Sequence, residues 1–215
     1  MVNNDGRPVG PVAALEALLA GNRRFALGSP RHPNQDAVHR VRAAEGQNPF
    51  AVVVGCSDSR VAAEIVFDCG LGDLFVVRTA GHLLGAEGLA SIEFAVAALH
   101  TPLVVVLGHD RCGAISAALD AHDHGRTPTG HLRVIAEQIV PEIRAAHARN
   151  ITDRDAIGEQ HVIATATRLL EQSPLLADRV DAGRLAIAGM TYALAQGRVR
   201  IVVSHDQSTR TSQRS

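Results

Sequence analysis

Short, uninterrupted runs of apolar residues recur along the chain from residue 50 onward, and each run ends in a glycine-rich or polar turn. Such runs are typical of β-strands that are covered on both faces, because neither row of side chains meets water. A further run at Val199–Val203 indicates an edge strand. The four buried strands are predicted at Ala51–Val54, Leu74–Val77, Leu103–Leu107 and Leu185–Ala188.

Helical periodicity fills the segments between these strands. Apolar residues three or four apart predict an amphipathic helix over Gly88–Leu99. A second such helix is predicted around residues 132–139, with its apolar stripe formed by Leu132, Ile135 and Ile139. The alternation of strand and helix favours a parallel sheet with right-handed crossovers.

Capping residues mark where two further helices begin. Thr152 is predicted to start one of them, because Asp155 stands three positions later in a near match to a capping box. Ser173 followed by Pro174 indicates an N-cap and a first-turn proline, and Gly183 is expected to end that helix.

The N-terminal part of the chain is predicted to be helical, without the strand–helix alternation of the rest. Residues 11–27 predict an amphipathic helix whose stripe holds Val12, Leu15 and Leu19. A polar helix is expected at about residues 35–45. We therefore predict a single α/β domain over residues 1–215. It comprises an N-terminal helical arm at about 11–46, an α/β core at about 50–203 and a frayed polar tail at 206–215.

Composition and charge narrow the classes of binding partner that the protein is expected to have. The formal net charge is −1, from 21 basic and 22 acidic residues, so no charge surplus favours nucleic acid or an anionic membrane. Aromatic residues make up only 3% of the chain, which argues against stacking on nucleic-acid bases. No apolar run approaches the roughly 20 residues that span a bilayer. Three cysteines in a chain of this size favour a reducing compartment, and we expect the cytoplasm.

The most reactive residues follow two of the predicted strands. Cys56 comes after the first strand, and His109 and Cys112 come after the third. Because ligands bind beyond the carboxyl ends of parallel strands, these three side chains are expected to meet at one metal ion. Two thiolates and an imidazole suit zinc, and three protein ligands leave one position open for catalysis. The alternative is that the cysteines are small buried core residues.

The segment Cys56-Ser-Asp-Ser-Arg60, followed by His109-x-x-Cys112, resembles the paired signature of the β-class carbonic anhydrases. The resemblance extends over about residues 11–203. It implies that Cys56, His109 and Cys112 bind one zinc ion per chain. It also implies that Asp58 and Arg60 form a dyad that orients zinc-bound hydroxide for the reversible hydration of carbon dioxide to bicarbonate and a proton.

The same resemblance implies further site residues. Gln47 would donate a hydrogen bond to the substrate, and Phe75, Ala80 and, across a dimer interface, Phe94 would wall the substrate pocket. For the three apolar residues, ordinary core packing is the alternative. The resemblance also implies a homodimer or homotetramer, with the N-terminal helix as an arm on the partner subunit.

Some members of this class close their site with the dyad aspartate as fourth zinc ligand, and a bicarbonate pocket of Trp, Arg and Tyr accompanies that state. Asp58, Arg78 and Tyr192 match three of these positions, but Val53 stands where the Trp would be. We therefore expect a pH-dependent closed state without the complete bicarbonate pocket.

Two other functions remain open at this point. One keeps the fold and the zinc but hydrolyses a related heteroallene, carbon disulfide or carbonyl sulfide. The other is a catalytically silent zinc-binding module, which the presence of both Asp58 and Arg60 disfavours. Among the remaining reactive residues, Cys69 is expected to pack against the sheet, and His122 and His124 are expected to be solvated in a loop.

Overall fold

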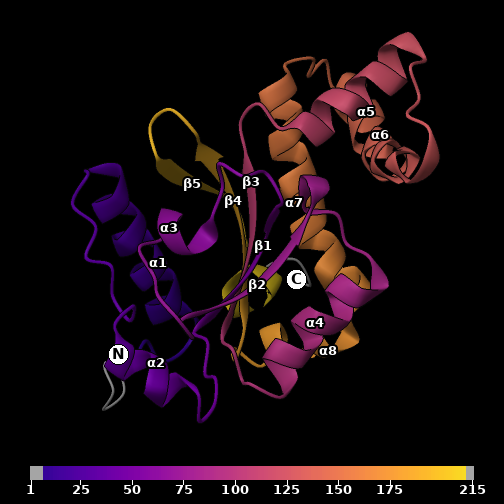
Figure 1. Ribbon diagram of the computed structural model, residues 1–215. Coiled ribbons are helices and arrows are strands. Elements are labelled where there is room, and N and C mark those ends of the chain that lie inside the picture. The colour runs from indigo at the N-terminus through magenta and orange to yellow at the C-terminus, as the bar shows by residue number, and fades with distance from the viewer. Residues whose placement is uncertain (1–6, 212–215) are drawn as a thin grey trace.

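A five-stranded sheet forms the centre of the computed structural model, which describes residues 7–211 (Figure 1). The strands lie in the order β2-β1-β3-β4-β5, and all neighbours pair in parallel except β4 and β5, which are antiparallel. The predicted mostly parallel sheet with an added edge strand is therefore confirmed. The strands are β1 (Ala51–Cys56), β2 (Leu74–Thr79), β3 (Leu103–His109), β4 (Ala186–Ala193) and β5 (Arg198–His205).

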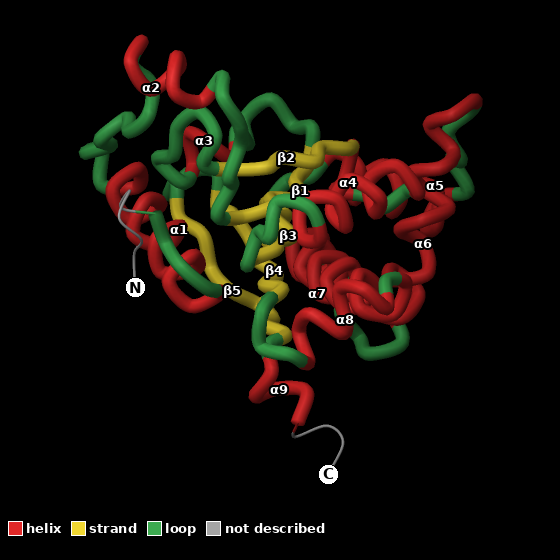
Figure 2. Tube along the Cα trace, turned by 90° about the horizontal axis from the view of Figure 1, so that it is seen from below, coloured by secondary structure: helices red, strands yellow, loops and turns green. Residues whose placement is uncertain are grey.

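Helices cover both faces of the sheet (Figure 2). Helices α1 (Pro11–Ala26) and α3 (Ala63–Val66) pack on one face, and α4 (Ala86–Ala97), α7 (Arg154–Gln172) and α8 (Pro174–Asp181) pack on the other. Successive residues of β1 alternate between the two cores, with Val53 toward α1 and Val54 toward α4 and α7. Complete burial on both sides explains why the strands are continuous apolar runs.

A third apolar cluster lies beyond the end of the sheet. It joins α5 (Gly113–His124) to α6 (Arg133–His147), and its centre is formed by Ile115, Ile139 and Ile143. Figure 1 shows these two helices projecting away from α4 and α8. Cys56 and Cys112 belong to the same cluster, so this pair of helices backs the ends of β1 and β3.

Helix α1 packs against the sheet of its own chain. Ala14 and Leu18 are fully buried there, and burial of a leucine side chain contributes about 1.5–3 kcal/mol. Asn22, 4% exposed, fastens the helix: its amide nitrogen donates to the carbonyl oxygens of Val66 and Gly197, and its amide oxygen accepts from the Val199 N–H. The predicted contact of this helix with a partner subunit stays a prediction.

Four details of the sequence prediction are wrong. Val12 is 71% exposed, because the buried face of α1 is formed by Ala14, Leu18, Gly21 and Asn22 instead. Leu132 is 62% exposed in a short 3-10 turn (η2, Gly130–Leu132) that precedes α6. Asp153 rather than Thr152 caps α7, because its carboxylate accepts from the Ala156 N–H at 2.8 Å. Residues Gln207–Thr211, expected to be frayed, form a short helix, α9.

Most other predicted boundaries hold to within about two residues, but β4 continues to Ala193, well beyond the predicted end at Ala188. The polar N-terminal helix is α2 (Ala37–Ala43), and Ser173 caps α8 as expected through its hydroxyl and the Leu176 N–H. Within residues 7–211, no helix combines the length and apolar character needed to cross a bilayer. Residues 212–215 of the predicted tail lie outside the described residues.

Candidate metal centre

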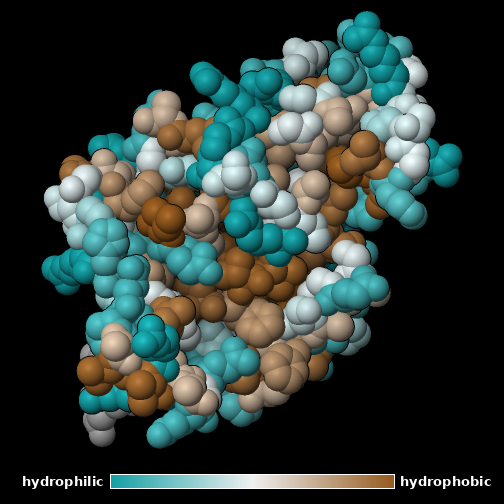
Figure 3. All heavy atoms as spheres, viewed as in Figure 1, coloured by the Kyte–Doolittle hydropathy of each residue, from teal (hydrophilic) through white to brown (hydrophobic). Residues whose placement is uncertain are grey.

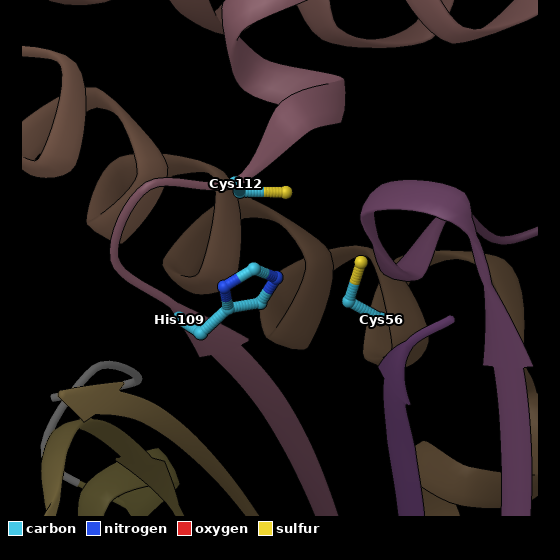
Figure 4. Close-up of side chains that lie close together, drawn as sticks. All are labelled: Cys56, His109 and Cys112. Carbon is cyan, nitrogen blue, oxygen red and sulfur yellow. The ribbon is translucent and has the colours of Figure 1, made fainter. Parts of the chain in front are cut away.

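Two thiols and one imidazole converge at the carboxyl ends of two neighbouring strands (Figure 4). Cys56 is the last residue of β1, His109 is the last residue of β3, and Cys112 is the N-cap of α5. One ligand atom from each side chain lies within 4.8 Å of the others. The structure thus brings together the three residues for which the sequence predicts a shared metal.

The imidazole of His109 is held with one nitrogen free for a ligand. Its Nδ1 lies 2.8 Å from the backbone carbonyl oxygen of Asp110, so Nδ1 carries the proton and donates it. Its Nε2 is buried and has no hydrogen-bond partner among the described residues. A buried nitrogen lone pair is costly unless something binds it, and a metal ion between this atom and the sulfurs would do so.

The two thiols differ in acidity. A hydrogen bond from the Cys112 thiol lowers the pKa of Cys56 to about 4, and the backbone N–H of Gly81, 3.3 Å from Sγ, also favours the thiolate. The pKa of Cys112 is raised, because its proton is the one shared with the Cys56 thiolate. A divalent cation would stabilise both residues as thiolates. The donor set of two sulfurs and one nitrogen therefore fits zinc.

The turn that carries His109 and Cys112 is anchored at both of its middle residues. Arg111 has a left-handed backbone (φ 53°), and its N–H donates to the carboxylate of Asp155 in the first turn of α7 at 2.8 Å. The carboxylate of Asp110 accepts from the Leu194 N–H at 2.9 Å. These two contacts hold an unfavourable backbone conformation in place, which fixes the separation of the two ligands.

Asp58 and Arg60 form the expected pair beside these ligands. The Arg60 guanidinium donates from Nε to Oδ1 at 2.9 Å and from Nη2 to Oδ2 at 2.7 Å, and its backbone N–H also donates to Oδ1. These bonds keep the pKa of the Asp58 carboxyl well below its usual range. Its Oδ2 lies 3.8 Å from Nε2 of His109, so the carboxylate is adjacent to the predicted metal position.

Arg78 supports the same loop from the edge strand. Its Nε donates to the backbone carbonyl of Cys56 at 3.0 Å, and its Nη2 donates to that of Asp58 at 2.7 Å. Tyr192 is on β4, with β1 and β3 between it and Arg78, and burial raises the pKa of its hydroxyl. Val53 is fully buried in β1. Val53 and Tyr192 belong to the same buried cluster on the α1 face of the sheet, and the bicarbonate pocket stays a prediction.

The predicted pocket residues are only partly assembled within one chain. The rings of Phe75 and Phe94 lie 6.4 Å apart at the outer side of β2 and α4, and Phe94 is 51% exposed. Ala80 begins the 3-10 turn η1 (Ala80–His82) beside the ligands. Gln47 is exposed in the segment before β1, and no hydrogen bond joins it to the ligands in the described part of the chain.

Two histidines that the sequence left without a role lie behind the site. His82 and His161 are 2% and 0% exposed, with ring centroids 4.6 Å apart. Nε2 of His161 donates to the carbonyl oxygen of Gly81, whose own N–H faces Cys56. Burial lowers the pKa of both histidines. The one sequence signal for this arrangement is Gly81 itself, because it adopts a left-handed backbone (φ 68°).

Two residues set aside in the sequence also have clear positions. Cys69 is buried in the core between α1 and the sheet, as expected, and burial raises the pKa of its thiol. His122 and His124 lie in the last turn of α5 rather than in a loop. His122 is moreover paired with an aspartate and a second histidine.

Comparison with known proteins identifies the family of this chain. A family model described as carbonic anhydrase matches residues 51–199. Carbonic anhydrase 2 of Mycobacterium tuberculosis is 49% identical over 188 residues, which cover 87% of this chain and 91% of that protein. A carbonic anhydrase of Mycolicibacterium smegmatis is 50% identical over 191 residues, covering 89% and 93%. The chain therefore belongs to the carbonic anhydrase family, as a member of its β class, and is an enzyme of that family.

The fold agrees as well. The β-carbonic anhydrase of Coccomyxa superposes with a TM-score of 0.73 at 23% identity, covering 92% of this chain and 91% of that one. A tetrameric β-carbonic anhydrase of Sordaria macrospora gives 0.71 at 24% identity, covering 88% and 98%.

Proposed function

We propose that this enzyme reversibly hydrates carbon dioxide to bicarbonate and a proton, with one zinc ion per chain held by Cys56, His109 and Cys112. The observation that carries the proposal is the convergence of two sulfurs and a buried, unpartnered nitrogen within 4.8 Å. Zinc bound at such a site lowers the pKa of a coordinated water, from about 15.7 toward about 7, and so supplies hydroxide near neutral pH.

Asp58 and Arg60 would orient this hydroxide toward the substrate. Asp58 stays ionised because Arg60 holds both of its oxygens, so it can accept a hydrogen bond but cannot donate one. A hydroxide that donates its proton to Asp58 has its lone pairs turned away from the carboxylate, toward an incoming carbon dioxide carbon. Gln47, Phe75 and Ala80 would bind the substrate, with Phe94 supplied by a second subunit.

Access to the site can be closed by the same carboxylate. We propose that at acid pH, when hydroxide is scarce, Asp58 leaves Arg60 and takes the fourth position on zinc. Its 3.8 Å approach to Nε2 of His109 supports this short movement. A crystal structure at acid pH should show Asp58 on the metal; a structure in which Asp58 still pairs with Arg60 would contradict the closed state.

A second copy of the chain would complete the molecule. The outer edge of β2 pairs with no strand in the described residues, and apolar side chains gather over β2 and α4 (Figure 3). Phe94 lies in this region with half of its surface exposed. An unpaired edge beside apolar surface favours association, and the solved tetrameric relative from Sordaria macrospora supports a homodimer or homotetramer.

The two rival functions are less well supported. Hydrolysis of carbon disulfide or carbonyl sulfide would use the same ligands, but the similar proteins are named carbonic anhydrases. A silent zinc module has no need for a dyad held by two side-chain hydrogen bonds.

The test is stopped-flow hydration of carbon dioxide on protein of measured zinc content, at about pH 7 and about pH 8.5, which bracket the titration of zinc-bound water. We expect fast turnover at the higher pH that disappears on chelation and returns with zinc. Two thiolates neutralise much of the charge of the metal, so turnover should be slower at the lower pH. Absence of turnover at both pH values, with one zinc per chain, would reject the proposal and favour its rivals.

A further inference from the structure

A second group of metal-binding side chains lies where the last turns of α5 and α6 meet. His122 and Asp123 come from α5, and His147 is the last residue of α6. One ligand atom from each residue lies within 4.8 Å of the others. This cluster is ten residues along α5 from Cys112, or about 15 Å at the rise of an α-helix. It is therefore separate from the candidate metal centre.

The carboxylate of Asp123 lies between the two imidazoles. Its Oδ1 is 2.7 Å from Nδ1 of His122 and 4.0 Å from Nδ1 of His147. The two rings are in an edge-to-face arrangement, with an interplanar angle of 77° and centroids 5.2 Å apart. The shorter contact is a hydrogen bond that His122 Nδ1 donates to this oxygen, so a small ion bound by the three atoms would replace that proton.

We propose that His122, Asp123 and His147 bind a divalent transition-metal ion of the zinc type. Zinc and the neighbouring transition metals accept two imidazole nitrogens and one carboxylate oxygen as ligands. Magnesium and calcium prefer oxygen ligands alone, so this set of ligands disfavours them. The side chains are 24%, 35% and 28% exposed, so an ion can enter and water can complete its coordination. The site is structural or regulatory in position, because no residue of the dyad reaches it.

Two helix ends favour a cation at this cluster, and one nearby arginine disfavours it. Both histidines stand in the last turn of their helices, where the partial negative charge of the carbonyl ends stabilises positive charge. Arg144, exposed on α6, lines the same hollow as His122, and its positive charge disfavours a cation there. Since two helix ends and a carboxylate outweigh one solvated guanidinium, we expect moderate affinity rather than the tight binding of a buried thiolate site.

A bound ion would join α5 to α6. These two helices form the apolar cluster that contains Cys56 and Cys112, so the ion would stiffen the support of the candidate metal centre from its far side. The effect expected is a higher unfolding temperature on addition of metal to protein that already holds its first zinc.

Isothermal titration of Zn²⁺ into the zinc-loaded enzyme at pH 7.5 tests the proposal, with bound metal counted by mass spectrometry. We expect a second equivalent per chain and a rise in unfolding temperature. Both should disappear in the double variant His122→Gln/His147→Gln, and Asp123→Asn should weaken binding roughly tenfold or more. The matched control is His124→Gln, which removes an exposed histidine from the same helix end and should bind like the native protein.

Cobalt separates this site from the thiolate site. Co²⁺ added to the zinc-loaded enzyme should give d–d absorption without the thiolate-to-cobalt band that exchange at Cys56 and Cys112 would produce. Circular dichroism confirms that each variant is folded. Absence of a second equivalent would overturn the proposal, and so would a second equivalent that survives in the double variant or is lost equally in His124→Gln.

Discussion

Arg78 donates a 2.7 Å hydrogen bond to the backbone carbonyl oxygen of Asp58 and so holds the loop after β1 against the edge strand. Its Nε makes a second such bond, to Cys56. Arg78, which the sequence matched to a bicarbonate pocket, thus makes two hydrogen bonds within its own chain. We infer that it positions the carboxylate of the dyad.

Replacement of Arg78 by Gln should therefore impair catalysis more than folding. Loss of two hydrogen bonds from a largely solvated guanidinium should lower the free energy of unfolding by only about 1 kcal/mol. A displaced Asp58 should reduce kcat about tenfold, since each 1.4 kcal/mol of transition-state stabilisation is worth that factor. Stopped-flow kinetics and urea denaturation measure the two effects. Unchanged kcat in a folded, zinc-loaded variant would remove Arg78 from the positioning role.

Arg60→Lys tests the geometry of the dyad rather than its charge. A lysine can give Asp58 one hydrogen bond but not the two parallel bonds of the guanidinium. We expect kcat to fall by about 10–100-fold, or about 1.4–2.7 kcal/mol, with zinc content unchanged. Arg133→Lys is the control, because Arg133 also pairs with a carboxylate, that of Glu137, but on the exposed face of α6. Equal kinetics for both variants would argue against an orienting dyad.

Gly81→Ala should destabilise the protein and loosen its hold on zinc. The residue has a φ of 68°, and a methyl group there would lie 2.7 Å from the Cβ of Ala114. Left-handed strain costs about 1–2 kcal/mol, and overpacking adds about 1–3 kcal/mol. The N–H that faces Cys56 would move with the backbone.

Gly28→Ala separates the cost of the left-handed backbone from the cost of the steric contact with Ala114. Gly28 has nearly the same φ, 69°, but open space around its Cα. Its substitution should cost only the strain of about 1–2 kcal/mol and leave zinc retention unchanged. Urea denaturation and the rate of zinc release to a chelator distinguish the two variants. Similar losses in both would show that the contact with Ala114 is unimportant.

His161 should make stability depend on pH in the acid range. Burial lowers its pKa to about 4 in the folded protein, against 6.5 in the unfolded chain. Between these values the unfolded chain takes up a proton that the folded protein does not. Stability is therefore lost as the pH falls from about 6.5 toward about 4, by up to about 3 kcal/mol for this group.

His161→Gln should flatten that dependence while keeping an N–H near the carbonyl of Gly81. The control is His131→Gln, because His131 is exposed and its removal should leave the slope unchanged. Urea denaturation from pH 4.5 to 7.5, with zinc content measured at each pH, provides the comparison. An unaltered slope in His161→Gln would show that the buried imidazole does not resist protonation.

The sequence predicted the sheet well because both of its faces are buried. A strand such as β3 has no polar face, so a continuous apolar run identifies it without knowledge of its neighbours. The same run stopped the prediction short at Leu107, because Gly108 and His109 are not apolar yet continue the pairing with β4. The three candidate metal ligands could be predicted for the same reason, since they follow two such runs.

Close approach and long-range contacts were not predictable in this way. The buried face of α1 includes Gly21, where a side chain would collide with the carbonyl oxygen of Phe67, and the polar Asn22. A stripe defined by large apolar residues therefore selected Val12 wrongly. The contact of His161 with Gly81 spans 80 residues, and the meeting of His122 with His147 depends on how two helices cross. Neither has a periodic signal.

Asn22 sets a limit on how far this protein can be shortened. Its three hydrogen bonds reach α3, the β4–β5 turn and β5. Arg24 of the same helix adds an ion pair with Asp68, just after α3. A truncation that removed this residue would leave two carbonyl groups and one N–H unsatisfied in the interior, at about 1–3 kcal/mol each. Anyone who designs a fusion or a minimal catalytic fragment should therefore treat α1 as part of the folding unit and place the junction before Pro11.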